Sequence, residues 1–319
     1  MNLNDKVAAL DLARGYAIFL VVWMHCLQYC AGMTFTNPLY AFIYAFHMPL
    51  FLIISGYLYF NKLKKREPRV NLTRRAKQLL LPNLLWGGAL AILTNNFGVN
   101  GILNSFWFLY TLFAVSVIYE IAYVLIRNIG VCTLIVSLLV LVLPGFEYVK
   151  FSTPFFGIGL WFGMFKLNEL KINNLYIGLS AIAGLLLYYF AWQGDEYIYI
   201  TKTPGLSNLG INEIRAYFIR IIVGTALSII VILIFHKYHK YTDFKLIRRF
   251  SNSSLGIYVI HLFSLILFIS FFDSFQEIFL RYFISVSEIV TLFVAFLYIL
   301  ATTYLIEHIH KTKYLTNII

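Results

Sequence analysis

Three polar residues interrupt the first apolar segment of the sequence, and their types are those of a catalytic or anion-binding site. Residues 8–30 are apolar over a length that suits a membrane span, yet they include Asp11, Arg14 and His25. A charged group at the centre of a bilayer costs at least ~2.5–3.5 kcal/mol, so such residues need a partner or a function. Asp11 and Arg14 are one helical turn apart and could form an ion pair.

Arg14 and His25 suit different tasks in a transfer reaction. Arginine keeps its charge in any environment, and its guanidinium binds phosphate or another anion through two donors. A neutral imidazole, with a pKa near ~6.5, is suited to take a proton from an alcohol, and burial favours the neutral form. The two residues are eleven positions apart, which on a helix is about 16 Å along the axis. We therefore predict an anion-binding group near one membrane face and a base deeper in the membrane.

A second imidazole, His47, lies in the next apolar segment, 39–60. The short connection between the two segments predicts antiparallel neighbouring helices, so His25 and His47 would lie at similar depth. Pro49 follows closely and removes a backbone donor from that turn. A single histidine in a membrane helix can also be satisfied by a hydrogen bond to a neighbouring helix, and this structural role stays open for His47.

Three further polar residues fall inside later apolar segments. Arg220 is well inside the segment 214–235, where we expect it to face a cavity. Tyr258 and His261 are three positions apart and would share a helix face, either as a structural hydrogen-bonding pair or in contact with substrate. The sequence contains no Ser-His-Asp spacing, nucleophile elbow, Walker loop or zinc motif.

The composition assigns the chain to the helical membrane proteins. Of its 319 residues, 61% are hydrophobic and 12% are charged, which is about half the usual charged fraction. The net charge of +11 then reports membrane topology and not nucleic-acid binding. Cys26, Cys30 and Cys132 are an odd number in apolar segments, so we expect no disulfide framework and, without a Cys/His cluster, no metal site.

Ten apolar segments predict an all-α integral membrane protein with a single transmembrane domain over residues 1–319. The segments are 8–30, 39–60, 79–97, 105–126, 131–149, 153–168, 172–193, 214–235, 254–272 and 285–306. With a cytoplasmic N-terminus, the basic residues gather in the inner loops, and the outer loops hold only Lys150, Lys202 and Arg281. This bias predicts about ten transmembrane helices with both the N- and C-termini cytoplasmic.

Two of the predicted inner loops, 61–78 and 236–249, are strongly basic. Such stretches mark topology and contact anionic lipid headgroups. They could instead form a docking surface for a polyanionic cytosolic donor, such as a nucleotide or coenzyme A. The longest outer loop, 194–213, is polar, and its aromatic residues could belong to an interfacial belt or could hold sugar rings.

Several of these stretches resemble the acyltransferase family 3 membrane proteins. LDLARGYAIFLVVWMH (10–25) resembles the first helix of that family, whose hallmark is an Arg and a His separated by ten residues. FHMPLFLIISGYLY (46–59) resembles the second-helix pattern, especially in the branch related to fucose 4-O-acetylases. RRAKQLLLP (74–82) is similar to the basic stretch before the third helix. FWFLYTLF (106–113) and SLGIYVIHLF (254–263) resemble later, looser motifs of the family.

The resemblance implies a multi-pass O-acyltransferase of the bacterial cytoplasmic membrane. It would move an acyl group, most often acetyl from acetyl-CoA, to a hydroxyl of a cell-envelope glycan or its lipid-linked precursor. His25 would be the base or acyl relay and Arg14 its basic partner, with Asp11 and His47 in the same catalytic group. The donor would be bound by Arg74, Arg75 and Lys77. Substrate or structural roles would fall to Trp107, Arg220, Tyr258 and His261. The expected partners are acyl-CoA, the glycan and membrane lipid, with no nucleic acid.

Two other classes of protein also contain buried polar residues. A transporter or flippase for a glycan or lipid-linked glycan would use intramembrane Arg and His, although the sequence lacks the internal repeat of many transporters. A scaffold for a polysaccharide synthase would leave the buried charges without a role. Within the acyltransferase interpretation, direct transfer and an acyl-enzyme both stay open.

Overall fold

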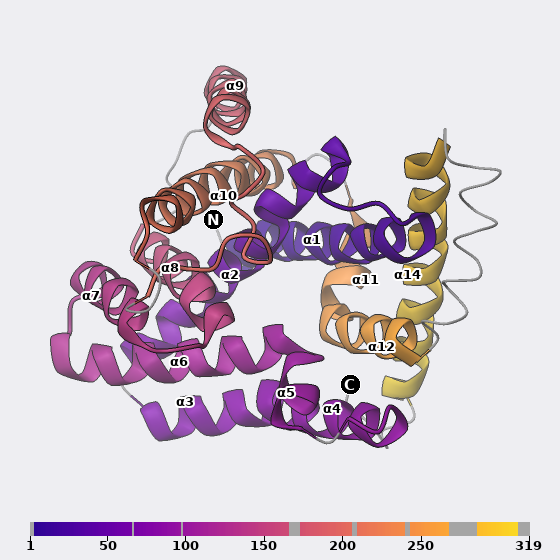
Figure 1. The fold of residues 1–319 in the computed structure, drawn as a ribbon, viewed down its shortest axis with the longest axis horizontal. Helices are drawn as coiled ribbons and strands as arrows, with labels where there is room; N and C mark the ends of the chain where they lie inside the picture. Colours follow the sequence, from indigo (N-terminus) through magenta and orange to yellow (C-terminus); the bar gives the residue numbers. More distant parts are fainter. Residues whose placement is uncertain are drawn as a thin grey trace. The chain divides into compact units, whose positions relative to one another are not determined.

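The computed structural model describes residues 3–65, 67–96, 98–165, 173–205, 209–239, 243–267 and 286–311, and within them the chain contains helices and no strand (Figure 1). The helices are α1 (Leu3–Ala31), α2 (Pro38–Lys64), α3 (Pro68–Arg75), the π-helical turn η1 (Ala76–Leu80), α4 (Leu81–Leu93), α5 (Val99–Asn104), α6 (Trp107–Ile126), α7 (Ile129–Val142), α8 (Glu147–Phe162), α9 (Asn174–Ala191), α10 (Ile211–Tyr238), α11 (Lys245–Asn252), α12 (Ser254–Leu267) and α14 (Ser287–Lys311).

The all-helical prediction is confirmed in these residues, since each of the ten apolar segments overlaps a helix. In the part of the chain that the structure describes, seven helical runs are long and apolar enough to cross a membrane: Ala8–Ala31, Pro38–Lys64, Pro68–Leu93, Trp107–Ile126, Asn174–Ala191, Ile211–Tyr238 and Ser287–His310. Two shorter apolar helices are Ile129–Val142 and Ser254–Leu265. The chain is therefore a multi-pass helical membrane protein, whereas the count of ten spans and the cytoplasmic side of the termini stay predictions.

The connection between α7 and α8 differs from the prediction. Gly145 and Phe146 have φ angles of 69° and 54°, and this left-handed backbone separates the two helices because it cannot continue an α-helix. Consequently α8 begins at Glu147, and Lys150 lies inside it, buried, with its Nζ 3.4 Å from a Glu147 carboxylate oxygen. The assignment of Lys150 to an outer loop is wrong.

The basic stretch 61–78 is also more helical than a loop. α2 continues to Lys64, and α3 begins at Pro68 and leads through η1 into α4. Pro82 lacks the backbone N–H that would bond to the carbonyl of Gln78, which gives a physical reason for a wider π-helical turn directly before it. The basic residues Arg74, Arg75 and Lys77 therefore stand on a continuous helical run, Pro68–Leu93.

The chain divides into two compact units. Unit 1 comprises Met1–Ala13, Ala45–Leu79 and Phe108–Thr242, and unit 2 comprises Arg14–Tyr44, Leu80–Trp107 and Asp243–Ile319. Because the boundaries fall within α1 and α2, both helices contribute to both units. In unit 1, α8 packs on α7 and α10, and α9 packs on α10. In unit 2, α12 packs on α4, α11 and α14. The single domain over 1–319 stays a prediction.

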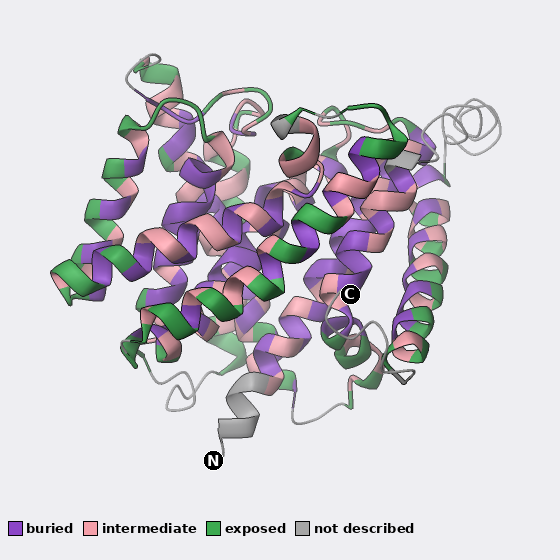
Figure 2. Cartoon of the chain, turned by 90° about the horizontal axis from the view of Figure 1, so that it is seen from below, coloured by how far each residue is buried: buried purple, intermediate pink, exposed green. Residues whose placement is uncertain are grey.

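Glycines let helix backbones approach closely in unit 1. A Cβ at Gly56 of α2 would meet the backbone carbonyl oxygen of Phe156, and one at Gly159 of α8 would meet that of Ile53. This reciprocal contact is a small-residue interface of the kind that membrane helices favour. Exposed and buried residues alternate along the helices (Figure 2). On α9 the exposed positions include Leu175, Leu179 and Phe190, which is an apolar surface suited to lipid.

Candidate functional site

Arg14 and His25 lie on one face of α1, because eleven residues are about three turns of an α-helix. Within unit 2, the Arg14 side chain contacts α11 and the His25 side chain contacts α12. Arg14 Nε donates a hydrogen bond to Ser251 Oγ (3.0 Å), and His25 Nδ1 lies 3.1 Å from His261 Nε2. The two residues singled out by their spacing thus face one partner surface. Asp11 stands one turn before Arg14 on α1, and its pairing with Arg14 stays a prediction.

A close backbone approach holds α11 against α1. A Cβ at Gly15 would collide with the carbonyl oxygen and side chain of Ile247, so only glycine allows this approach. Ser251, one turn further along α11, is buried with 1% of its surface exposed and accepts from Arg14. At its last turn, α11 is tied to α14 by two hydrogen bonds, of 2.8 and 2.7 Å, from Arg249 to the Glu307 carboxylate.

His261 connects His25 to the backbone of α12. Its ring is 1% exposed, and its Nδ1 lies 2.7 Å from the carbonyl oxygen of Ile257, one turn earlier. The His25 and His261 ring centroids are 5.2 Å apart, with 32° between the ring planes. Tyr258 also lies against His261, edge to face at 5.8 Å. The expected proximity of Tyr258 and His261 is observed, and the contact of His261 with His25 was not anticipated.

The looser motifs of the sequence meet near this histidine pair in unit 2. Phe106, the first residue of the FWFLYTLF stretch, packs edge to face on Tyr258 with ring centroids 6.3 Å apart. The carbonyl of Phe106 accepts a hydrogen bond from Asn83 Nδ2 (2.8 Å), and Asn83 directly follows the RRAKQLLLP stretch. Trp107 begins α6 beside Phe106 and is half-buried. Residues from three stretches that are distant in the sequence therefore pack together beside the contact of His261 with His25.

His47 is buried on α2 in unit 1, whereas His25 belongs to unit 2, so their common depth stays a prediction. Near His47 the proline and a glycine bring α2 against α10. A Cβ at Gly224 would touch Pro49 and the carbonyl of Ala45, and Ser228 Oγ donates to the carbonyl of Phe46 (3.3 Å). The backbone around Pro49 is thus satisfied partly by the neighbouring helix.

The predicted donor-binding residues differ in environment. Arg74 and Lys77 are exposed, whereas the Arg75 guanidinium lies over the ring of Tyr59, 4.5 Å from its centroid. Among the described residues, the buried Nε of Arg75 has no hydrogen-bond partner. Beside it, Glu120 accepts from Tyr59 Oη (2.6 Å) and Asn71 Nδ2 (2.9 Å). These two hydrogen bonds satisfy the buried carboxylate of Glu120.

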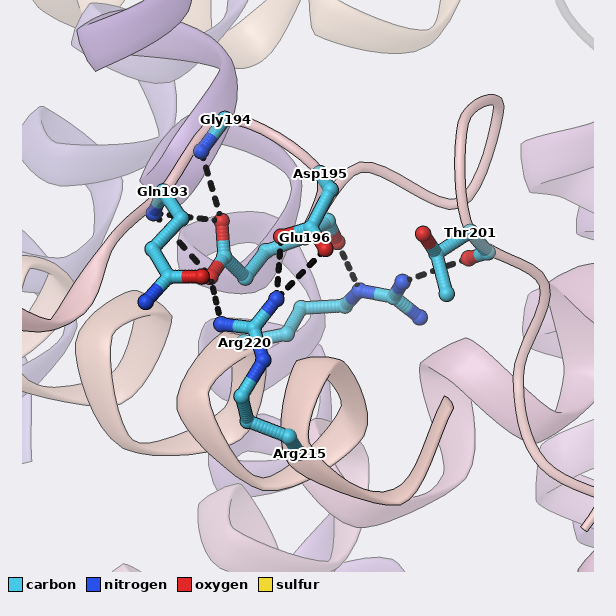
Figure 3. A network of polar contacts seen from close by, with 7 residues as sticks. All are labelled: Gln193, Gly194, Asp195, Glu196, Thr201, Arg215 and Arg220. Atoms are coloured by element: carbon cyan, nitrogen blue, oxygen red, sulfur yellow. Dashed lines mark hydrogen bonds and ion pairs between the residues drawn. The ribbon is translucent and has the colours of Figure 1, made fainter. Parts of the chain in front are cut away.

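A polar cluster in unit 1 fixes the start of the long loop after α9 (Figure 3). The buried carboxylate of Glu196 accepts from the backbone N–H groups of Gln193 (3.0 Å) and Gly194 (2.9 Å). Arg215 bridges two acids, with Nη1 2.8 Å from Glu196 and Nη2 2.5 Å from Asp195. This cluster was not predicted from the sequence, although the two adjacent acids and the nearby arginines were a visible signal.

Arg220 also binds the loop that follows α9. Its Nε donates to the carbonyl of Glu196, its Nη2 to the carbonyl of Thr201 (2.8 Å) and its Nη1 to Thr203 Oγ1 (3.4 Å). The cavity expected in front of Arg220 is therefore replaced by loop backbone, and the residue anchors the loop. Between these anchors, burial raises the pKa of the Tyr197 hydroxyl well above its ordinary value, which keeps this tyrosine neutral.

Comparison with known proteins defines the class that this fold and the Arg14–His25 pair indicate. The chain belongs to the acyltransferase family 3, because the family's sequence model, described as an acyltransferase domain, matches residues 7–308. This confirms the resemblance carried by the motifs and identifies the chain as a member of this family.

Individual relatives are the nodulation proteins NolL of two bacteria. The chain is similar to NolL of Sinorhizobium fredii, with 27% identity over 220 residues, which are 61% of this chain and 60% of that protein. It is 39% identical to NolL of Mesorhizobium japonicum over 87 residues, 26% of this chain and 23% of the relative. The match thus spans about three fifths of the first relative's length. No solved structure matches.

Proposed function

We propose that the protein is an O-acyltransferase of the bacterial cytoplasmic membrane. It transfers an acyl group, acetyl in the simplest case, from acyl-CoA to a hydroxyl of a cell-envelope glycan or its lipid-linked precursor. The observation that carries the proposal is the position of Arg14 and His25 on one face of α1, with Arg14 in contact with α11 and His25 in contact with α12. A cationic group and an imidazole so arranged suit anion binding and proton transfer at separate depths.

His25 supplies the base in this proposal. As the acceptor hydroxyl attacks the thioester carbonyl, its proton passes to the imidazole, the new C–O ester bond forms and the C–S bond breaks. The imidazolium then returns the proton to the departing thiolate of coenzyme A. If an acyl-enzyme forms instead, the imidazole nitrogen attacks the thioester carbonyl and the C–S bond breaks to release the thiolate of coenzyme A. The acceptor hydroxyl then attacks the acyl-imidazole, the C–N bond breaks, and the hydroxyl proton passes to the thiolate.

Arg14 on α1 and the α3–η1 run are two separate sources of positive charge, each suited to an anionic group. The hydrogen bond to Ser251 fixes the orientation of the Arg14 guanidinium. On the helical run, Arg75 is oriented by the face of Tyr59, while Arg74 and Lys77 extend to the surface. Coenzyme A carries phosphates, for which guanidinium groups are suited ligands. We assign donor binding to Arg74, Arg75 and Lys77.

The test is acyl transfer by the purified protein in lipid nanodiscs. The protein is incubated with acetyl-CoA labelled in the acetyl group and with envelope glycan isolated from cells lacking this protein. We expect label in the glycan with wild-type protein and none with His25→Ala, whereas His310→Ala, an exposed histidine on α14, keeps full activity.

Two results would contradict the proposal. Undiminished labelling by His25→Ala would remove the proposed base. A wild-type protein that labels no glycan, but moves unmodified lipid-linked glycan across a vesicle membrane, would establish the transporter alternative instead.

A further inference from the structure

The contacts of His261 determine where its single proton lies. A backbone carbonyl oxygen only accepts hydrogen bonds, so the short contact with the carbonyl of Ile257 (2.7 Å) requires a hydrogen on His261 Nδ1. The ring is 1% exposed, and a second proton would place an imidazolium charge in this buried position, which is costly without a counter-charge. The neutral ring with Nδ1–H therefore presents a lone pair at Nε2.

The position of the proton on His25 follows from its contact with His261. Its Nδ1 lies 3.1 Å from that lone pair, so His25 Nδ1 is the donor in this contact. A neutral His25 with a proton on Nδ1 has its lone pair on Nε2. An imidazole in water prefers the opposite form, with the proton on Nε2. Without the acceptor of His261, the nitrogen needed as a base would carry the proton for much of the time.

We propose that His261 is a positioning residue, which fixes the tautomer and ring orientation of His25 so that Nε2 of His25 is the reacting nitrogen. This inference rests on the proposed function, and the chain of bonds runs from Ile257 through His261 to His25. When Nε2 takes the proton of the acceptor hydroxyl, the positive charge is shared with Nδ1–H, and His261 Nε2 accepts the strengthened hydrogen bond. His261 stays neutral, and no proton leaves the pair toward Ile257.

Two substitutions separate the two bonds of His261. In His261→Gln the carboxamide oxygen can occupy the place of Nε2 and accept from His25. In His261→Asn the shorter side chain can keep the donor to Ile257 but does not reach His25. A merely structural role predicts that asparagine, which preserves the local bond in α12, is tolerated at least as well as glutamine. The positioning role predicts the reverse order.

The first measurement is acyl transfer in nanodiscs by wild type, His261→Gln and His261→Asn. We expect kcat of His261→Asn to fall by about 10–100-fold, the range typical for loss of a hydrogen-bond partner that orients a metal-bound imidazole, with the KM for acyl-CoA nearly unchanged. His261→Gln should recover most of that loss. Equal activity of the two variants, or a better asparagine variant, would overturn the inference while leaving the acyltransferase assignment intact.

The second measurement reads the tautomer directly in the wild-type protein and does not depend on activity. In wild-type protein labelled with ¹⁵N-histidine, the ¹⁵N shifts of the His25 signal, assigned by its absence in His25→Ala, distinguish Nδ1–H from Nε2–H. We expect Nδ1–H. A predominant Nε2–H form would overturn the inference. A wild-type protein that labels no glycan would instead refute the proposed function. The failure of the inference and the failure of the proposed function are therefore distinguishable.

Discussion

Replacing Glu196 by glutamine removes one charge from a buried site without changing its shape. Glu196 has no exposed side-chain surface and accepts from two backbone N–H groups and from Arg215. A hydrogen bond to a charged group contributes about 1.5–3 kcal/mol, against about 0.5–1.5 kcal/mol for a neutral one. The amide would weaken all three bonds and place an NH₂ group against a donor. We therefore expect the anchored loop to lose about 2–4 kcal/mol.

A matched control is the neighbouring acid, which pairs with the same arginine. Asp195 is 37% exposed and bonds to Arg215 through one guanidinium nitrogen. Water compensates an exposed carboxylate, and such pairs contribute only about 0.2–1 kcal/mol. Asp195→Asn should therefore change the stability of the loop much less than Glu196→Gln, although both substitutions remove one negative charge beside Arg215.

Hydrogen exchange in the protein reconstituted in nanodiscs measures the difference. The amides of Gln193 and Gly194 donate to Glu196, so their exchange reports the opening of this anchor. Because 1.4 kcal/mol is a factor of ten, Glu196→Gln should accelerate exchange in peptides covering 192–205 by about 30-fold or more. Equal acceleration by both substitutions, or none by Glu196→Gln, would refute the reasoning.

Two further predictions concern the close approach of α1 to α11 and the binding of the donor. Gly15→Val should abolish acyl transfer, because the valine side chain would push Ile247 away and separate Arg14 from Ser251. The control Gly88→Ala, at a position with open space around it, should retain activity. Equal acyl-transfer activities of the two variants in nanodiscs would contradict this prediction. Arg75→Gln should raise the KM for acyl-CoA about 10-fold or more with a smaller change in kcat, since a charged phosphate contact of about 1.5–3 kcal/mol is lost. The exposed Arg127→Gln is its control, and an unchanged KM in Arg75→Gln would exclude the assigned role.

The class of the protein and the position of Arg14 and His25 on one face of a helix were predictable because they depend on local features. Hydropathy over about twenty residues identifies membrane helices, and charged residues inside them are conspicuous. The spacing of the two residues also places them on one helix face whatever the rest of the fold does. These inferences need no knowledge of distant contacts.

The partners of these residues were not predictable, since they lie far away along the chain. Ser251 and His261 are separated from Arg14 and His25 by 237 and 236 residues, and nothing in a helical pattern encodes such pairing. Lys150 was wrongly assigned to a loop because it is charged. It lies inside α8, which begins after the turn at Gly145, and it forms an ion pair with Glu147. Electrostatic pairing decided its position where hydropathy alone misled.

The two contacts of α1 have a consequence for motion. Arg14 and His25 are eleven positions apart on α1, and the residues that they meet, Ser251 and His261, are ten positions apart on the adjoining helices. Because both pairs have nearly the same spacing, α1 and this segment fit together in one register. A piston-like slip of α1 by even part of a turn would break both contacts simultaneously. In the proposed reaction, anion binding by Arg14 and proton transfer by His25 would then be switched on or off together.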